Sequence, residues 1–280
     1  MTVNETDLHV EERGSGKPIV LVHGSASDVR TWQAQSDGLS QGHRVIAFSR
    51  RYHWPNGSIP PSADYAMREH VSDLVALLER MGAAPANVVG HSYGGLVALE
   101  VAMSAPRLLR RLVLIEPPVL TLFTSNEPKP AELLKLLFTR PRTAAAIVRL
   151  GAKGFAPAKA AARRGDLDRA LHAFGTAVLG EKSYQALSSE RLEQARRNTF
   201  QAEFLGSGFP PLSAQAIRNI RIPVLLVTGS LSPSVFHRFA DRLEELLPDV
   251  QRVEIPDASH IVHEDNPEDL NAAVLAFCGG

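Results

Sequence analysis

The chain alternates between short apolar runs and stretches of helical spacing, and this alternation is the feature that most constrains its fold. Apolar runs, most of them closed by Gly or Pro, occupy residues 19–22, 45–48, 88–89, 112–115 and 224–227, while residues 251–255 alternate between polar and apolar before Pro256. Such runs are typical of strands that are buried on both faces of a sheet. Helical patterns lie between them at residues 66–81, 96–104, 235–247 and 267–277. Strands that alternate with helices predict an α/β fold with a mostly parallel sheet and helices on both of its faces.

The alternation stops between about residues 117 and 213, where the chain is rich in Ala, Leu, Arg and Lys. Helical patterns in this part cover residues 131–137, 142–150, 167–178 and 190–199. A helical block inserted between two strands of a parallel sheet would lie over their carboxyl ends as a lid. We therefore expect a core formed by residues 1–116 and 214–280, and a lid formed by residues 117–213.

The composition excludes several classes of function. Lys plus Arg and Asp plus Glu number 30 each, so no overall charge attracts nucleic acid or an anionic membrane. The one cysteine cannot form an internal disulfide, which fits a reducing compartment. The start of the chain lacks a basic patch followed by an apolar run, and no stretch reaches the roughly 18 apolar residues of a membrane span. We expect a cytoplasmic protein, and the absence of metal-ligand spacing or a phosphate loop predicts no cofactor.

Residues 90–94 read Gly-His-Ser-Tyr-Gly and match the pattern G-x-S-x-G. A strand is predicted before this segment and a helix after it, which is the context that the motif requires. The glycines make room for a sharp turn, and the turn would push the hydroxyl of Ser92 clear of the sheet. The segment therefore predicts Ser92 as a nucleophile, and the alternative is a Gly-rich turn with a capping serine.

The whole chain resembles the α/β-hydrolase superfamily at three landmarks that occur in the expected order. They are His23-Gly24 after the first apolar run, the segment around Ser92, and Ser259-His260 near the end of the chain. The resemblance implies that the backbone N–H groups of Ser25 and Tyr93 form an oxyanion hole. It also implies that neither of these two side chains is needed for that role.

A serine hydroxyl needs a general base within hydrogen-bond reach. His260 follows the last predicted strand and comes after Ser92 in the chain, as the fold requires. His263 is the nearest competitor for this role. We expect His91 to point away from the site and His23 to lie under the oxyanion loop as a structural hydrogen-bond partner.

The acid of the triad is where the chain departs from its relatives. Many of them carry an Asp three residues after the Gly that ends the penultimate strand, and here Ser232 follows Gly229 at that spacing. Glu116 ends the strand that follows the nucleophile strand, and the resemblance places this strand between those that lead to Ser92 and Gly229. Some branches, among them haloalkane dehalogenases and certain lactone hydrolases, carry the acid on this strand. We expect Glu116 to be the acid; Asp257, Asp28, Asp265 or a dyad without an acid remain alternatives.

Two segments could shape a substrate pocket. Residues 49–57 are basic and aromatic, and could contact an anionic or aromatic substrate. A solvated loop whose arginines pair with local carboxylates is the interpretation that we favour. In the predicted lid, an apolar cavity could be lined by Leu122, Phe123, Leu136, Leu137 and Phe138.

These observations predict a serine hydrolase that cleaves a carboxylic ester or lactone of a small apolar or aromatic molecule. The residues expected to act are Ser92 as nucleophile, His260 as base, Glu116 as acid, and Ser25 and Tyr93 as oxyanion donors. A carboxylate would be needed in place of Ser92 for an epoxide or haloalkane route through an alkyl-enzyme. A cofactor-free perhydrolase, a C–C bond hydrolase and a ligand receptor with little turnover remain alternatives.

Overall fold

The computed structural model describes residues 1–207 and 209–279, and its core is a seven-stranded sheet with the order β3-β5-β4-β6-β7-β8-β9. The edge strand β3 is antiparallel to β5, and the other neighbouring strands are parallel. This confirms the expected mostly parallel sheet, with β7 between β6 and β8. The strands are β3 (Val10–Arg13), β4 (Pro18–Val22), β5 (Arg44–Phe48), β6 (Ala86–His91), β7 (Leu109–Ile115), β8 (Val224–Gly229) and β9 (Val250–Ile255), and a small separate sheet pairs β1 (Thr2–Val3) with β2 (Thr6–Asp7).

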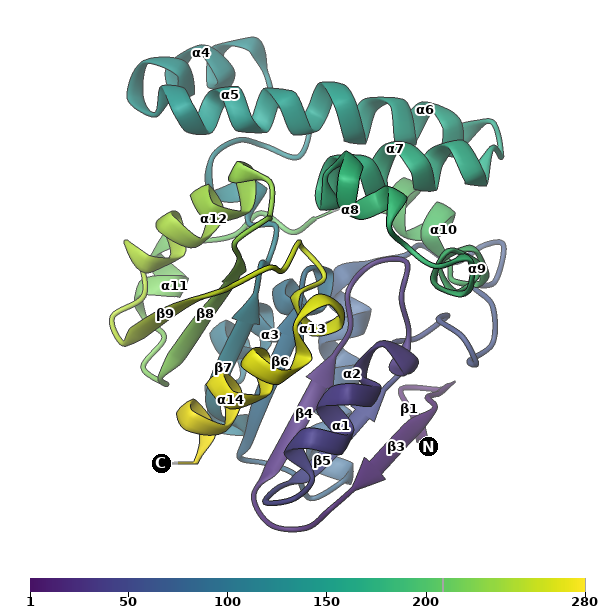
Figure 1. The fold of residues 1–280 in the computed structure, drawn as a ribbon, viewed down its shortest axis with the longest axis vertical. Coiled ribbons are helices and arrows are strands. Elements are labelled where there is room, and N and C mark those ends of the chain that lie inside the picture. The colour runs from purple at the N-terminus through teal and green to yellow at the C-terminus, as the bar shows by residue number, and fades with distance from the viewer. Residues whose placement is uncertain (208, 280) are drawn as a thin grey trace.

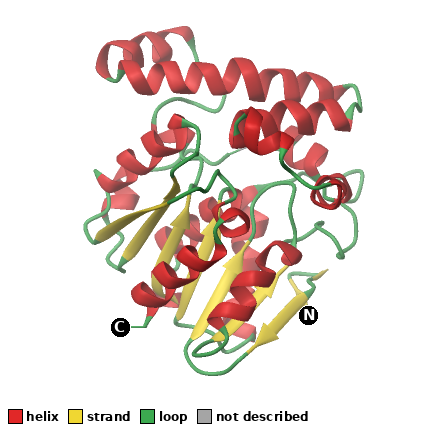
Figure 2. Cartoon of the chain, in the orientation of Figure 1, coloured by secondary structure: helices red, strands yellow, loops and turns green. Residues whose placement is uncertain are grey.

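Helices cover both faces of the sheet, in front of the strands and behind them in Figure 2. Successive residues of a strand point to opposite faces, so Val20 and Val22 belong to one apolar cluster, while Ile19 and Leu21 belong to another. The helices of the first face are α2 (Met67–Arg80), α3 (Tyr93–Ser104), α11 (Ala214–Arg218) and α12 (Ser234–Glu244). Those of the second face are α1 (Gln33–Leu39), α13 (Val262–Asp265) and α14 (Pro267–Cys278).

The segment between β7 and β8 forms a layer of helices above the sheet, at the top of Figure 1. We call it the helical layer. A π-helical turn, Gly151–Phe155, joins two of its helices into a long rod. Three of its helices, α6, α8 and α10, were not predicted. The layer contains α4 (Pro130–Thr139), α5 (Pro141–Leu150), α6 (Ala156–Arg163), α7 (Leu167–Leu179), α8 (Glu181–Gln185), α9 (Ser189–Arg197) and α10 (Phe200–Leu205).

Several loops that leave the carboxyl ends of the strands carry strained backbone on the side of the helical layer. Ala26 after β4, Ser92 after β6 and Glu116 after β7 all have positive φ values, of 49°, 49° and 48°. Residues other than glycine adopt this conformation at a cost of about 1–3 kcal/mol each, and only where the surrounding structure enforces it. The strained positions therefore mark the edge of the sheet at which a functional site is expected.

Candidate active site

Ser92 lies on a sharp turn between β6 and α3, with φ 49° and ψ −119°. The turn leaves no room for side chains at its two glycines. A Cβ atom at Gly90 would come within 2.6 Å of the carbonyl oxygen of Gly94, and one at Gly94 within 2.2 Å of the carbonyl oxygen of Val22. The Ser92 amide donates to the carbonyl oxygen of Ile115 on the next strand, at 2.8 Å. The turn is thus fixed from both neighbouring strands, and this is the conformation that the motif predicted.

The structure brings Ser92, His260 and Glu116 together in one chain of hydrogen bonds. His260 Nε2 lies 3.0 Å from Ser92 Oγ, and His260 Nδ1 lies 2.6 Å from Glu116 Oε2. All three residues are buried, and the imidazole of His260 stacks on the ring of Phe236 with centroids 4.0 Å apart. In this arrangement Nδ1–H donates to the carboxylate, and Nε2 is left to accept a proton from the hydroxyl.

Glu116 reaches this position because β7 lies between the strands that lead to Ser92 and Gly229. Its second carboxylate oxygen, Oε1, accepts a hydrogen bond from the amide of Gly229 at 2.8 Å. Ser232, which takes the place of the usual acid in the sequence, is buried, and its hydroxyl has no hydrogen-bond partner within residues 1–207 and 209–279. The carboxylate that contacts the imidazole therefore follows β7, and not the neighbouring strand β8 that carries the usual acid position.

The other histidines near the site are held by different partners. His263 Nε2 lies 2.8 Å from the hydroxyl of Thr31. His91 Nε2 donates to the carbonyl oxygen of His260 at 2.9 Å, and so supports the backbone of the loop that carries His260. His23 lies behind the loop after β4, as expected: its Nδ1 donates to the carbonyl oxygen of Gly24 at 2.9 Å, and its Nε2 accepts from the amide of Arg50 at 2.9 Å.

The competing carboxylates do not reach the imidazole. Asp28 binds Arg30, with the closest oxygen and nitrogen 2.7 Å apart. Asp265 accepts from the amide of Ser259 at 2.7 Å, and Asp257 is exposed on a turn. Of the four carboxylates weighed from the sequence, Glu116 is the one in contact with His260.

The two expected oxyanion donors lie beside Ser92. A Cβ atom at Gly24 would come within 3.1 Å of Ser92 Cβ, so the loop after β4 passes directly by the nucleophile. Ser25 follows in that loop, and Tyr93 is the first residue of α3, whose first N–H groups have no partner within the helix. Both residues line the same cavity as Ser92.

This cavity has a volume of about 290 Å³ and lies between the strand ends and the helical layer. A smaller pouch of about 70 Å³ adjoins the cavity and shares Ser25, Ser92 and His260 with it. Both hollows are mainly apolar. The cavity is lined by Ile147, Leu150, Phe155, Phe174, Phe204 and Phe209, among others, and the pouch by Leu171, Leu179, Leu187, Leu192, Ala195 and Ile261, among others.

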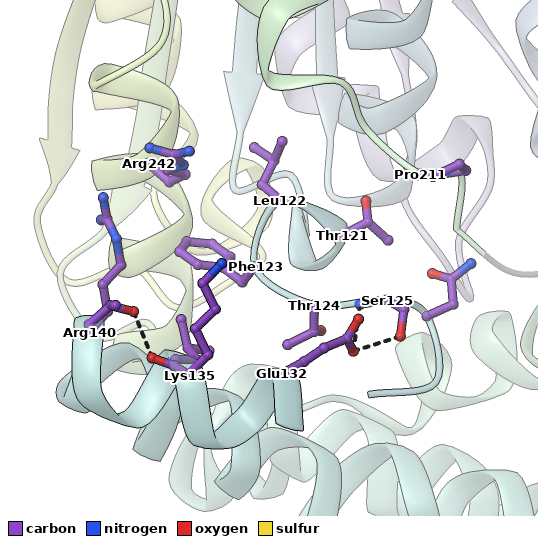
Figure 3. Close-up of a pocket in the computed structure, with 13 residues that line it drawn as sticks. Thr121, Leu122, Phe123, Thr124, Ser125, Glu132, Lys135, Arg140, Pro211 and Arg242 are labelled. Atoms are coloured by element: carbon purple, nitrogen blue, oxygen red, sulfur yellow. Dashed lines mark hydrogen bonds between the residues drawn. The ribbon is translucent and has the colours of Figure 1, made fainter. Parts of the chain in front are cut away.

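The apolar residues that the sequence suggested as the lining of a cavity do not line the hollows at Ser92. Leu137 and Phe138 are exposed on α4. Leu122, Phe123 and Leu136 line a different, wider hollow of about 680 Å³ between α4, the loop before it and α12. Figure 3 shows that hollow, with Arg140 and Lys135 on one side and Thr121 and Ser125 on the other. Ser92, His260 and Glu116 do not line it.

The two arginines of the basic loop after β5 are not solvated, contrary to the interpretation favoured from the sequence, although Trp54, Pro55 and Gly57 of the same loop are exposed. Arg51 does pair with local carboxylates, with its Nε 2.6 Å from Asp73, but it is buried. Arg50 is 1% exposed; its hydrogen bonds go to backbone carbonyls and Tyr65, and its ion-pair partner, Glu203, is distant in the sequence. Burial of these arginines depends on segments distant in sequence, and no local pattern signals it.

Glu203 of the helical layer is a second buried carboxylate that the sequence did not indicate. It lines the cavity, and its Oε1 accepts from the hydroxyl of Ser25 at 2.6 Å. Arg50 lies 3.6 Å from the same oxygen. Burial raises the pKa of Glu203, and the positive charge of Arg50 opposes that rise.

The described part of the chain contains no cluster of three His, Cys, Asp or Glu side chains that could hold a metal ion. Over the same residues, each helix is too short or too polar to cross a membrane.

Residues 17–267 match a protein family described as alpha/beta hydrolase fold. The chain belongs to this family. The matched part of this α/β hydrolase includes Ser92, Glu116 and His260, and therefore covers the whole hydrogen-bonded chain described above.

Relatives of this α/β hydrolase act on different bonds. It is 25% identical to a putative carbamate hydrolase, RutD, of Azorhizobium caulinodans over 276 residues, which cover 98% of this chain and 96% of that protein. It is 24% identical to bifunctional epoxide hydrolase 2 of Sus scrofa over 312 residues, covering 96% of this chain but 53% of the pig protein, so the chain spans about half the length of that relative. The solved structure of a thermophilic esterase from Thermogutta terrifontis superimposes with a TM-score of 0.67 at 24% identity, over 98% of this chain and 93% of that one. The relatives support a hydrolase and leave open which bond it cleaves.

Proposed function

We propose that this α/β hydrolase is a serine hydrolase that cleaves a carboxylic ester or lactone through an acyl-enzyme on Ser92. The observation that carries the proposal is the continuous hydrogen-bonded chain from Ser92 Oγ through His260 to Glu116. A serine in this position forms an ester with the acyl group, whereas epoxide opening through an alkyl-enzyme needs a carboxylate there.

In the proposed reaction, His260 Nε2 takes the proton from Ser92 Oγ as the oxygen attacks the substrate carbonyl carbon. The carbonyl oxygen becomes an oxyanion, which the N–H groups of Ser25 and Tyr93 stabilise. The C–O bond to the leaving alcohol then breaks, and His260 passes the proton to that alcohol. Water, activated by the same imidazole, releases the acid from Ser92. Throughout, Glu116 accepts a hydrogen bond from Nδ1–H and stabilises the imidazolium.

We also propose that residues 117–213 act as a lid on a core formed by residues 1–116 and 214–280. Support comes from the two hollows at Ser92, whose apolar walls are mostly residues of the helical layer. A small molecule with apolar or aromatic groups would be desolvated between the layer and the strand ends. Such burial strengthens the electrostatic interactions at the reacting carbonyl.

A ligand receptor with little turnover was the main alternative of a different class. The feature that favoured it was the missing acid at Ser232. Glu116 supplies a carboxylate to His260, so this feature no longer favours a receptor over an enzyme.

A fluorophosphonate probe tests the nucleophile directly. Ser92 Oγ attacks phosphorus and fluoride leaves, so the wild-type protein is expected to be labelled and to hydrolyse short p-nitrophenyl esters. Ser92→Ala is expected to lose labelling and about 10⁴-fold or more of kcat, since a triad without its nucleophile retains little more than binding. Ser104→Ala, at the exposed end of α3, is the control and is expected to behave as wild type. Tight ligand binding without labelling or turnover would favour the receptor instead.

A further inference from the structure

We infer that Glu203 is a positioning residue through which the helical layer holds Ser25 in the geometry that stabilises the oxyanion. This inference rests on the proposed function of Ser92. It starts from the fact that Glu203 lies on α10, outside the sheet, and yet is buried against the loop after β4.

The backbone on one side of Ser25 is fixed from behind. The carbonyl oxygen of Gly24 accepts from an Arg50 nitrogen at 2.9 Å and from His23 Nδ1 at 2.9 Å. A trans peptide is planar, so its N–H points opposite to its C=O. Because both donors hold the Gly24 carbonyl, the N–H of Ser25 is directed away from Arg50.

The side chain of Ser25 is fixed from the helical layer. Its hydroxyl donates to Glu203 Oε1 at 2.6 Å, and that oxygen lies 3.6 Å from Arg50. A second hydrogen bond joins the helical layer to the same loop, because Arg191 of α9 donates to the carbonyl oxygen of Ala26 at 3.1 Å. Ala26 has a positive φ of 49°, a conformation that a non-glycine residue keeps only where the surrounding structure enforces it.

Arg50 links the two expected donors. Its guanidinium carbon lies 4.7 Å from the centre of the Tyr93 ring, and its nitrogens reach the carbonyls of His23 and Gly24. Glu203 is the acidic partner of this buried cation. The pair therefore joins the helical layer, the loop after β4 and the start of α3 into one unit around the oxyanion position.

Kinetics of Glu203→Met and Ser25→Ala test the inference. Glu203→Met removes the acceptor, and Ser25→Ala removes the donor but keeps the backbone N–H and the Arg50–Glu203 pair. Each is expected to lower kcat for p-nitrophenyl butyrate about 10- to 100-fold with KM within about 3-fold, because a misplaced donor costs part of what a deleted one does. The double variant is expected to lose little more of kcat than either single variant does. Glu203→Gln keeps an acceptor for Ser25 and is expected to recover part of the loss.

A pair of inhibitors separates positioning from a merely structural role. Ser92 Oγ adds to the carbonyl carbon of a trifluoromethyl ketone, and the carbonyl oxygen then becomes an oxyanion in the site. The corresponding alcohol cannot form this adduct and carries no charge. The Ki of the ketone is expected to rise in both variants as much as kcat/KM falls, while the Ki of the alcohol changes little. Glu193→Met, on the exposed side of α9, is the matched control and is expected to leave both constants unchanged.

Three outcomes would overturn the inference. One is an equal rise of both Ki values, which would make Glu203 a residue for folding or ground-state binding. Another is wild-type kinetics in Ser25→Ala, which decides the question even if Glu203→Met does not fold. A third is a wild-type protein that neither hydrolyses esters nor binds the ketone, and this result would remove the proposed function as well.

Discussion

Two buried glutamates contact residues of the candidate site, and they belong to different parts of the molecule. Glu116 follows β7, and its two hydrogen-bond partners are His260, in the loop after β9, and the amide of Gly229, the last residue of β8. Glu203 comes from the helical layer and contacts Ser25 in the loop after β4. The base side of the site is thus complete within the sheet core, whereas the oxyanion side depends on the layer above it.

Substitutions on the two sides are therefore expected to have different effects. A substitution on the base side should lower the rate of the chemical step even when the helical layer is unchanged. A substitution in the layer should change the oxyanion side and the shape of the substrate hollows, while the hydrogen bonds of His260 stay intact. Kinetic measurements on variants of each side therefore test whether the two sides act independently.

The largest effect is expected from Glu116→Gln. The amide can present its N–H₂ group to His260 Nδ1 and select the wrong tautomer, so we expect kcat to fall by about 10³- to 10⁴-fold with KM nearly unchanged. Steady-state hydrolysis of p-nitrophenyl butyrate measures this loss. Ser232→Ala is the matched control, because it removes the side chain at the usual acid position, and it should stay within about 3-fold of wild type. A large loss in Ser232→Ala with little loss in Glu116→Gln would contradict the assignment of the acid.

The contrast also explains what could be predicted from the sequence. The strands β4 to β8 were recognised because strands buried on both faces need uninterrupted apolar runs, and β9 was recognised because its residues alternate between polar and apolar. The edge strand β3 was missed, since Val10–Arg13 reads Val-Glu-Glu-Arg and is partly exposed. The residues of the base side could be placed because each follows a strand end, and the parallel sheet brings such ends to one edge.

On the oxyanion side, the sequence predicted the two backbone donors, Ser25 and Tyr93, but not the buried residues around them. Burial of Arg50 requires Tyr65, the carbonyls of residues 23 and 24, and Glu203 from the helical layer. These partners are far apart in the sequence, and none of them is marked by periodicity. The same is true of the apolar lining, where exposed and buried leucines of the layer have similar local patterns: Leu137 is 51% exposed, whereas Leu136 is buried.

A smaller effect is expected from the shape of the pouch at Ser92. Its volume of about 70 Å³ corresponds to roughly two or three groups the size of a water molecule. We therefore expect one arm of the ester to be limited to short chains, while the arm in the 290 Å³ cavity varies more freely. Leu171→Ala should enlarge the pouch and improve kcat/KM for an ester with one or two more methylenes in the restricted arm by about 10-fold.

Two series of esters measure this restriction, one with varied acyl chains and one with varied alcohols. A steep decline in one series alone is the expected result, and Leu171→Ala should shift that decline without altering the other series. Leu137→Ala, on the exposed side of α4, is the control. Equal tolerance of both series would show that the pouch does not accept substrate.

The last effect concerns stability rather than rate, on the oxyanion side, where histidines pack around the charge of Arg50. Burial, and then the charge of Arg50, hold the pKa of His70 well below its usual value, and its ring nitrogens have no hydrogen-bond partner in the described residues. Below the unfolded pKa of about 6.5 the unfolded chain binds the proton more readily, so this group makes the free energy of unfolding fall as the pH decreases, by up to about 1.4 kcal/mol per pH unit. His70→Phe should remove that contribution. The difference in the free energy of unfolding between wild type and His70→Phe, measured in urea at pH 8, gives the effect of the substitution on packing. At pH 5 this difference should shift in favour of the variant. An unchanged difference between the two pH values would mean that His70 takes up its proton in the folded state.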